Sequence, residues 1–170
     1  MTRPLPRSLD RAAFVATYGH VFEHSPWIAE AAWDAGLPAD ADTAQGLHRA
    51  LCAALEPAPA GRKLDLIQAH PDLAGKLAQA GRLTAESTGE QASAGLDRLT
   101  DMERAEFTAL NDAYRARFGF PFIIAVKGLS KSEILAAFKR RLNNDRETEL
   151  ATALAQVERI ALLRLQDLMP

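Results

Sequence analysis

The sequence offers little that would cross-link the protein, anchor it or charge it strongly. Cys52 is the one cysteine among 170 residues, so an internal disulfide and a cysteine-rich metal site are both excluded. No stretch approaches the roughly 20 apolar residues that cross a bilayer, and no apolar stretch follows the N-terminal arginines as in a secretory signal. The formal net charge of −2 provides no basic surface for nucleic acid or an anionic membrane. We therefore expect a cytoplasmic protein that binds neither nucleic acid nor membranes.

Motifs for cofactors and activated nucleophiles are missing as well. The sequence has no Gly-x-Gly-x-x-Gly, no P-loop and no Gly-x-Ser-x-Gly. His20 and His24 have a spacing that would let them share a metal on one helix. However, Ser25-Pro26 is expected to begin a new helix directly after them. These patterns predict a site that uses neither a metal nor a cofactor.

The remaining composition favours helices, because alanine and leucine dominate and runs of β-branched residues are few. Capping boxes are predicted where Thr100 is followed by Glu103, and where Ser130 is followed by Glu133. Asp145 is placed to cap a last long helix that ends at about residue 168. We predict an all-α fold of about eight helices in one domain, residues 1–170, with residues 1–9 as an N-terminal extension.

One segment departs from the helical pattern. The stretch FGFPFIIAVKG, residues 118–128, contains a glycine, a proline and several β-prone apolar residues. No second strand-like run exists to pair with it, so we expect a buried extended segment between helices. Its backbone N–H and C=O groups need other partners. A bound polar ligand and a set of side chains with water are both compatible with the sequence.

His70 lies where a helix is expected to end, because Pro71 disfavours helical geometry in the residue before it. A charged histidine at this place is stabilised by the helix dipole, which explains the residue without any function. The alternative is a general acid or base that is held on rigid backbone and titrates near neutral pH. Position alone favours the first interpretation.

Ser87, Glu90 and Gln91 follow His70 in the motif Ser-x-x-Glu-Gln. Ser87 and Glu90 have the spacing of a capping box, which would account for Glu90 structurally. Gln91 would then point off the start of a helix, where free N–H groups face a ligand. A Glu–Gln pair in this position supplies acceptors and donors that suit a urea-like or amide-rich small molecule.

Several blocks, in this order and spacing, resemble a known family. They are EHSPWIAEAAW, AHPDLAGKLA, LTAESTGEQASAGL, LNDAYRARFGFPFIIAVKG, ILAAFKRRLNN and ALAQVERIALLRL. Together they are similar to the family of 2-oxo-4-hydroxy-4-carboxy-5-ureidoimidazoline (OHCU) decarboxylases, and the resemblance covers roughly residues 10–168. It implies an all-helical, cofactor-free homodimer that converts OHCU to (S)-allantoin and CO2 in urate degradation.

The resemblance also assigns roles to individual residues. His70 corresponds to the catalytic residue. The residues implied to bind the substrate are Pro71, Ser87, Glu90, Gln91, Phe122, Ile123, Ile124, Ala125, Val126 and Arg159. For Arg159, helical phasing is equally compatible with a solvated side chain.

A homodimer is also expected from the last helix, which is apolar nearly all round between Val157 and Leu165. Such a helix is enclosed by the core or by a second subunit. Two other interpretations of the whole sequence stay open. One is a decarboxylase or hydrolase that acts on a related ureido or imidazolone compound, and the other is a helical interaction module without enzymatic activity.

Overall fold

The computed structural model describes residues 3–169 and contains no β-strand in that range. The all-α prediction is therefore confirmed. Two short 3-10 helices, η1 (Pro6–Ser8) and η2 (Ala39–Asp42), accompany the α-helices. These are α1 (Arg11–Tyr18), α2 (Trp27–Asp34), α3 (Ala44–Leu55), α4 (Ala60–Gln68), α5 (Lys76–Gln79), α6 (Ala85–Ser93), α7 (Asp101–Phe118), α8 (Lys131–Arg141) and α9 (Arg146–Leu168).

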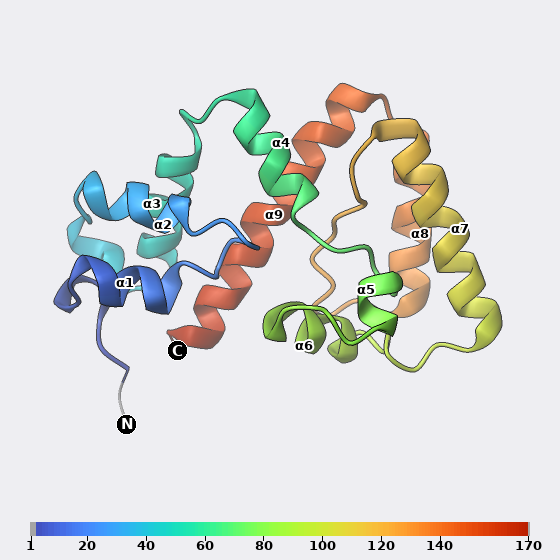
Figure 1. Ribbon diagram of the computed structural model, residues 1–170, viewed down its shortest axis with the longest axis horizontal. Helices are drawn as coiled ribbons and strands as arrows, with labels where there is room; N and C mark the ends of the chain where they lie inside the picture. Colours follow the sequence, from blue (N-terminus) through green and yellow to red (C-terminus); the bar gives the residue numbers. More distant parts are fainter. Residues whose placement is uncertain (1–2, 170) are drawn as a thin grey trace. The chain divides into compact units, whose positions relative to one another are not determined.

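The chain forms two compact units. Unit 1 contains the residues up to Ala69 and those from Val157 onward, and unit 2 contains His70–Gln156. Unit 1 therefore holds α1 to α4, and unit 2 holds α5 to α8, while the residues of α9 are divided between the two (Figure 1). The expectation of a single domain over residues 1–170 stays a prediction, and residues 1, 2 and 170 lie outside the described part of the chain.

Side-chain caps fix the starts of the long helices in unit 2. Thr100 and Glu103 form a capping box at α7, and Ser130 and Glu133 form another at α8. Each box satisfies two of the N–H groups that a helix start leaves unpaired. The Asp145 carboxylate accepts a hydrogen bond from the Thr148 N–H at 2.7 Å at the start of α9. These three predicted caps are confirmed, whereas the capping box predicted at Ser87 is not present.

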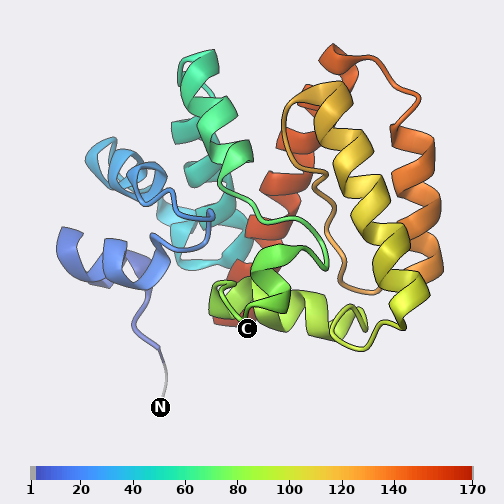
Figure 2. The same ribbon diagram turned by 45° about the vertical axis from the view of Figure 1, so that its right-hand side comes forward.

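The core of unit 2 is aromatic. Figures 1 and 2 show α7 and α8 running side by side, with the segment that connects them folded back along α7. The Phe122 ring of that segment stacks on Phe138 of α8, with ring centroids 3.8 Å apart. Tyr114 of α7 meets Phe122 edge-on at 5.4 Å, a geometry that aromatic pairs favour. The connecting segment is therefore part of the core, as the sequence predicts.

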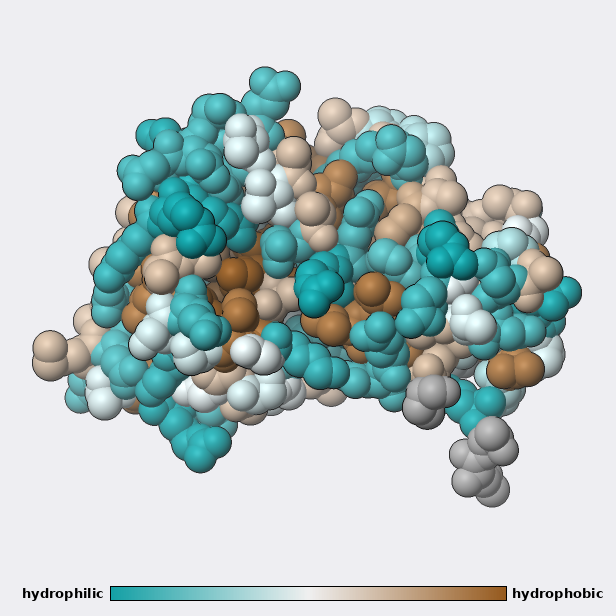
Figure 3. All heavy atoms as spheres, turned by 180° about the vertical axis from the view of Figure 1, so that it is seen from behind, coloured by the Kyte–Doolittle hydropathy of each residue, from teal (hydrophilic) through white to brown (hydrophobic). Residues whose placement is uncertain are grey.

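The surface is mixed in character. Figure 3 shows polar side chains over much of one face, with apolar side chains visible between them. Three large apolar residues of the described chain are strongly exposed, namely Leu5, Leu77 and Met102. Within residues 3–169, no helix is both long enough and apolar enough to span a membrane.

Candidate active site

His70 begins unit 2 and is buried, with 6% of its surface exposed. Helix α4 ends at Gln68, two residues before the end that Pro71 predicts, and Ala69 is its C-cap. His70 itself lies in a bend rather than in the helix. The loop 70–75 that it starts connects α4 to α5 and is itself half-buried or buried throughout.

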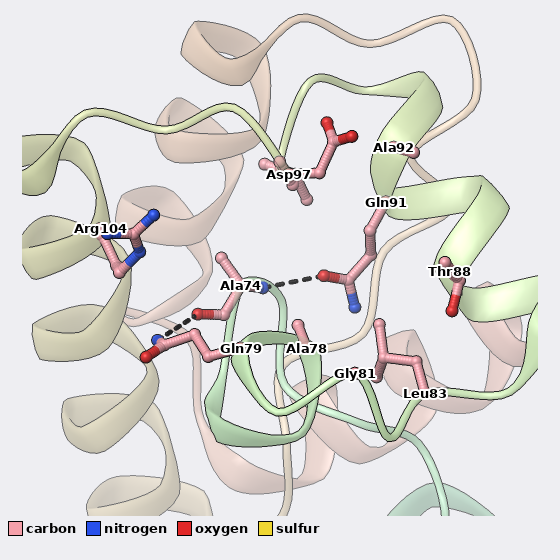
Figure 4. Close-up of a pocket in the computed structure, with 11 residues that line it drawn as sticks. Ala74, Ala78, Gln79, Gly81, Leu83, Thr88, Gln91, Ala92, Asp97 and Arg104 are labelled. Atoms are coloured by element: carbon pink, nitrogen blue, oxygen red, sulfur yellow. Dashed lines mark hydrogen bonds between the residues drawn. The ribbon is translucent and has the colours of Figure 1, made fainter.

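Gln91 of α6 binds this loop on one side. Its amide oxygen accepts a hydrogen bond from the Ala74 N–H at 2.9 Å (Figure 4). Its amide nitrogen donates to the Asp72 carbonyl at 3.3 Å. The side chain is buried. Gln91 lies in the last turn of α6 (Ala85–Ser93), not at its start. The expectation that it points off the helix N-terminus is therefore wrong. Its amide carbonyl and one N–H already bind protein groups.

Helix α7 binds the same loop from another side. The Asn111 amide donates to the Leu73 carbonyl at 2.9 Å. The Arg115 Nε donates to both oxygens of the Asp72 carboxylate, at 2.9 and 3.2 Å. Side chains of two helices thus hold three consecutive residues directly after His70-Pro71.

Ser87 and Glu90 lie within α6. The helix begins at Ala85, and its N-cap is Thr84, whose hydroxyl oxygen accepts a hydrogen bond from the Ser87 N–H. The predicted capping box of Ser87 and Glu90 is therefore wrong, because Thr84 precedes Ser87 and occupies the cap. Ser87 is buried and Glu90 is half-buried. Capping of α6 therefore does not explain the presence of Glu90.

Ser87, Glu90 and Gln91 share one face of α6, because residues three and four apart on a helix are neighbours. Gln91 ties this face to the loop that begins at His70. The structure therefore brings together the two motifs that the sequence separates, within unit 2.

Side chains of α8 and α9 hold the extended segment 122–126. The Arg141 guanidinium donates to the Ile123 carbonyl at 2.6 Å, and the Ala125 N–H donates to the Gln156 side-chain oxygen at 2.9 Å. For these two groups, the side-chain alternative of the sequence analysis is what the structure contains. A ligand at the Ala125 N–H would have to displace Gln156.

A buried ion pair fixes Arg141. Its guanidinium donates to Glu149, whose side chain is fully buried and also accepts hydrogen bonds from Tyr114 and Asn144. Burial opposes ionisation of Glu149, but the hydrogen bonds from Arg141 and its neighbours outweigh it and lower the pKa of the carboxyl below 4.5. Burial and the bond to Glu149 raise the pKa of Tyr114, which stays protonated as a donor.

A cavity of about 520 Å³ lies beside Gln91 (Figure 4). Helices α5 and α6 and the start of α7 contribute to its lining, which includes Gln79, Thr88, Gln91, Asp97 and Arg104. Of the residues that the sequence assigns to the site, Gln91 is the one that lines this cavity. The cavity therefore borders the loop contact but is not formed around His70.

The other sequence candidates lie elsewhere. Arg159 is exposed on the part of α9 that belongs to unit 1. His20 and His24 both follow the end of α1 at Tyr18, and His24 has a positive φ of 49°, so the two do not share a helix. Within residues 3–169, no group of three His, Cys, Asp or Glu side chains is arranged to hold a metal ion.

Sequence reasoning missed Asn111, Arg115, Arg141 and Glu149. For Asn111 a signal exists: it lies four residues after Phe107 and three before Tyr114, on the apolar stripe of α7. A polar residue in such a stripe requires a buried hydrogen-bond partner. The Asp72–Arg115 contact joins residues 43 apart in the chain, and no local pattern indicates it.

Comparison with known proteins identifies the family. The profile described as OHCU decarboxylase matches residues 7–166. This chain belongs to the OHCU decarboxylase family. The resemblance drawn from the sequence blocks is thereby confirmed.

Individual family members are similar over nearly the whole chain. The 2-oxo-4-hydroxy-4-carboxy-5-ureidoimidazoline decarboxylase of Halalkalicoccus jeotgali is 42% identical over 159 residues, which are 94% of this chain and 86% of that protein. A crystal structure of (S)-allantoin synthase superposes with a TM-score of 0.75 and 35% identity, over 95% of this chain and 52% of that one. A crystal structure of OHCU decarboxylase in the presence of (S)-allantoin, 23% identical with a TM-score of 0.67, shares the fold over 95% and 99% of the two chains.

Proposed function

We propose that this protein is a carboxy-lyase that converts OHCU to allantoin and CO2 in urate degradation, with (S)-allantoin as the product. The observation that carries the proposal is membership of the OHCU decarboxylase family over residues 7–166. The 42% identity with a decarboxylase of that name, over 94% of this chain, supports the same reaction.

The substrate itself can accept the electrons of the reaction. OHCU carries a hydroxyl and a carboxylate on one ring carbon, next to a ring C=N bond. When the bond to the carboxylate breaks and CO2 leaves, its electron pair forms a double bond between the two ring carbons. The C=N electrons move to nitrogen, which takes a proton. Loss of the hydroxyl proton and protonation of the carbon that carries the ureido group then yield allantoin.

We assign His70 to these proton transfers. Protonation must occur on one face of the planar intermediate to give one enantiomer, so the proton donor has to be fixed in space. His70 is buried and starts a loop whose next residues are hydrogen-bonded to α6 and α7. An imidazole held in this way suits general acid and base catalysis near neutral pH.

Substrate contacts are proposed from the neighbouring elements. Ser87, Glu90 and Gln91 share one face of α6, and their hydroxyl, carboxylate and amide groups match the N–H and C=O groups of a ureide. Gln91 contributes its remaining N–H. The other proposed contacts in unit 2 are Pro71 and the backbone of Phe122, Ile123, Ile124, Ala125 and Val126, where a substrate at the Ala125 N–H would replace the Gln156 side chain. Arg159 belongs to unit 1, and its contact with a substrate anion stays a prediction from the sequence.

The decisive experiment uses freshly prepared OHCU and follows optical activity. OHCU decays on its own to racemic allantoin, so only a chiral product reports the enzyme. We expect the protein to produce an excess of (S)-allantoin and to turn over OHCU faster than related ureido and imidazolone compounds. Racemic product at the spontaneous rate would show that the assignment is wrong.

We further propose a cytoplasmic homodimer. Leu162 and Leu163 of α9 remain half-buried, whereas Val157, Ala161 and Leu165 on the same helix are buried. These half-buried leucines support a contact with a second copy. Sedimentation equilibrium should give twice the 18.5 kDa mass of the chain, and the monomer mass would contradict the dimer.

A further inference from the structure

We propose that Arg115 and Asn111 of α7 are positioning residues that fix the loop of His70 and thereby its imidazole. The inference rests on the role of His70 in the proposed function. Neither residue is assigned to substrate, and both act through the loop residues that follow His70-Pro71, Arg115 through the Asp72 carboxylate and Asn111 through the Leu73 carbonyl.

The contacts form a clamp around three consecutive residues. Arg115 grips both carboxylate oxygens of Asp72, and Asn111 donates to the Leu73 carbonyl. From α6, Gln91 binds the backbone of Asp72 and Ala74. Hydrogen bonds from α6 and α7 therefore restrain three consecutive residues of the loop.

The loop backbone has little freedom to absorb a displacement. Pro71 fixes its own φ and restricts His70 before it. Ala74 has a positive φ of 51°, a conformation that residues other than glycine rarely adopt. A Cβ added at Gly75 would lie 2.7 Å from the Asp72 Cβ, so the chain folds tightly on itself here. A shift of Asp72 is therefore passed through Pro71 to His70.

Packing does not account for Asn111. Its side chain is 4% exposed and lies on the apolar stripe of α7. Its amide oxygen is buried and has no hydrogen-bond partner within the described chain, which destabilises the fold. Its amide nitrogen, in contrast, binds the loop. Asn111 is therefore a polar residue on the apolar stripe of α7, and the contact that its side chain makes is the hydrogen bond to the loop.

Variants of Arg115 can distinguish a loss of His70 positioning, which lowers kcat, from a loss of stability, which lowers Tm. The Arg115 and Asp72 side chains are 41% and 25% exposed, and an ion pair of this kind contributes little stability. We expect Arg115→Gln to lower kcat by about 10- to 100-fold through misplacement of His70, with KM and Tm close to the parent values. Arg115→Lys should restore part of the lost kcat, because it keeps the charge but not the guanidinium geometry.

A matched control comes from another ion pair that involves α7. Lys139 of α8 pairs with Glu106 of α7 at 2.8 Å, and both side chains are well exposed. Lys139→Gln removes a comparable ion pair that does not touch the loop of His70, so kcat should be unchanged. An equal loss of kcat in both variants would indicate a general effect on α7 and would overturn the proposal.

Two further measurements distinguish this inference from the proposed function. In a His70→Asn background, Arg115→Gln should cause no additional loss of enantioselective rate, because both changes affect one group. A further tenfold loss there would refute positioning. Hydrogen exchange of the Ala74 amide, which donates to Gln91, should be at least about tenfold faster in Arg115→Gln and in Asn111→Leu. This readout needs no substrate, so unchanged exchange refutes the clamp even if OHCU is not turned over.

Discussion

Four histidine side chains occupy different environments in this protein. His20 and His24 are exposed, and His48 is half-buried with a ring nitrogen 2.8 Å from the Glu158 carbonyl. His70 alone is buried. It also precedes the loop that α6 and α7 hold in place. Burial and a fixed backbone are what a stereoselective proton donor requires, and they distinguish His70 from the other three.

Replacement of His70 by Asn should strongly lower the rate of enantioselective decarboxylation without reducing it to zero. Asn keeps a polar side chain of smaller size but cannot exchange a proton near neutral pH. We expect kcat/KM to fall by a factor of about 10² to 10⁴, measured by the optical activity of the allantoin formed. His24→Asn serves as the control, because that side chain is 67% exposed. Parent-like formation of (S)-allantoin by His70→Asn would disprove the catalytic assignment.

Glu90 and Thr84 allow substrate binding to be separated from helix capping. Thr84→Ala removes the N-cap of α6 and should lower the free energy of unfolding by about 0.5–2 kcal/mol. Glu90→Gln leaves that cap intact, so Tm should change little while KM rises or kcat falls. Denaturant unfolding and steady-state kinetics of both variants measure the two effects. Unaltered kinetics in Glu90→Gln would exclude Glu90 from the site.

Two helical glycines test how tightly neighbouring elements pack. At Gly46 of α3, an added Cβ would lie 1.9 Å from the backbone oxygen of Asp40, which cannot easily move. Gly46→Ala should therefore cost about 1–3 kcal/mol of stability. At Gly61 of α4, nothing lies within 4 Å of the added Cβ, and Gly61→Ala should stabilise by about 0.4–1 kcal/mol. Urea denaturation should give opposite signs, and equal effects would contradict this description of the packing.

The ion pair between α8 and α9 makes stability depend on pH. The folded pKa of Glu149 lies below its ordinary value of 4.5, so its contribution is present above about pH 4.5. That contribution is lost as the pH falls through the lowered pKa. Glu149→Gln should weaken the acid dependence of Tm below pH 4.5. At pH 7 it should cost about 3–5 kcal/mol, because Arg141 then stays buried without its carboxylate.

Thermal unfolding of the parent and Glu149→Gln between pH 3 and pH 7 would measure both effects. An identical pH dependence in the parent and Glu149→Gln would contradict the assignment.

Local patterns predict the helices better than they predict the site. Thr100 and Ser130 are followed by Glu at the right spacing, and both cap their helices as expected. The same spacing at Ser87 is misleading, because Thr84 begins α6 three residues earlier. Which of two hydroxyl residues starts a helix depends on how the preceding loop packs, and the sequence does not display that packing. Contacts between distant residues, such as Asp72 with Arg115, are hidden for the same reason.

For the protein as a whole, we predict that activity does not depend on a metal. The proposed reaction places the electron pair within the substrate, so no Lewis acid is needed. Dialysis against EDTA should leave kcat within about twofold of the untreated value. Removal of a catalytic metal would lower kcat far more, because such a metal stabilises the transition state by several kcal/mol. Loss of activity that Zn²⁺ restores would require a different mechanism.

The division of the chain into two units has a consequence for its synthesis. Unit 2 is one continuous stretch, His70–Gln156, whereas unit 1 needs residues from both ends of the chain. Glu23 and Arg164, a buried ion pair with an N–O distance of 2.8 Å, lie in the two separate segments of unit 1, so this pair forms only after residue 164 has been synthesised. On the ribosome, domains fold once all of their residues have emerged. Unit 1, most of which precedes unit 2 in the chain, therefore completes its core after unit 2, and a chain that stops before Val157 lacks residues of that core.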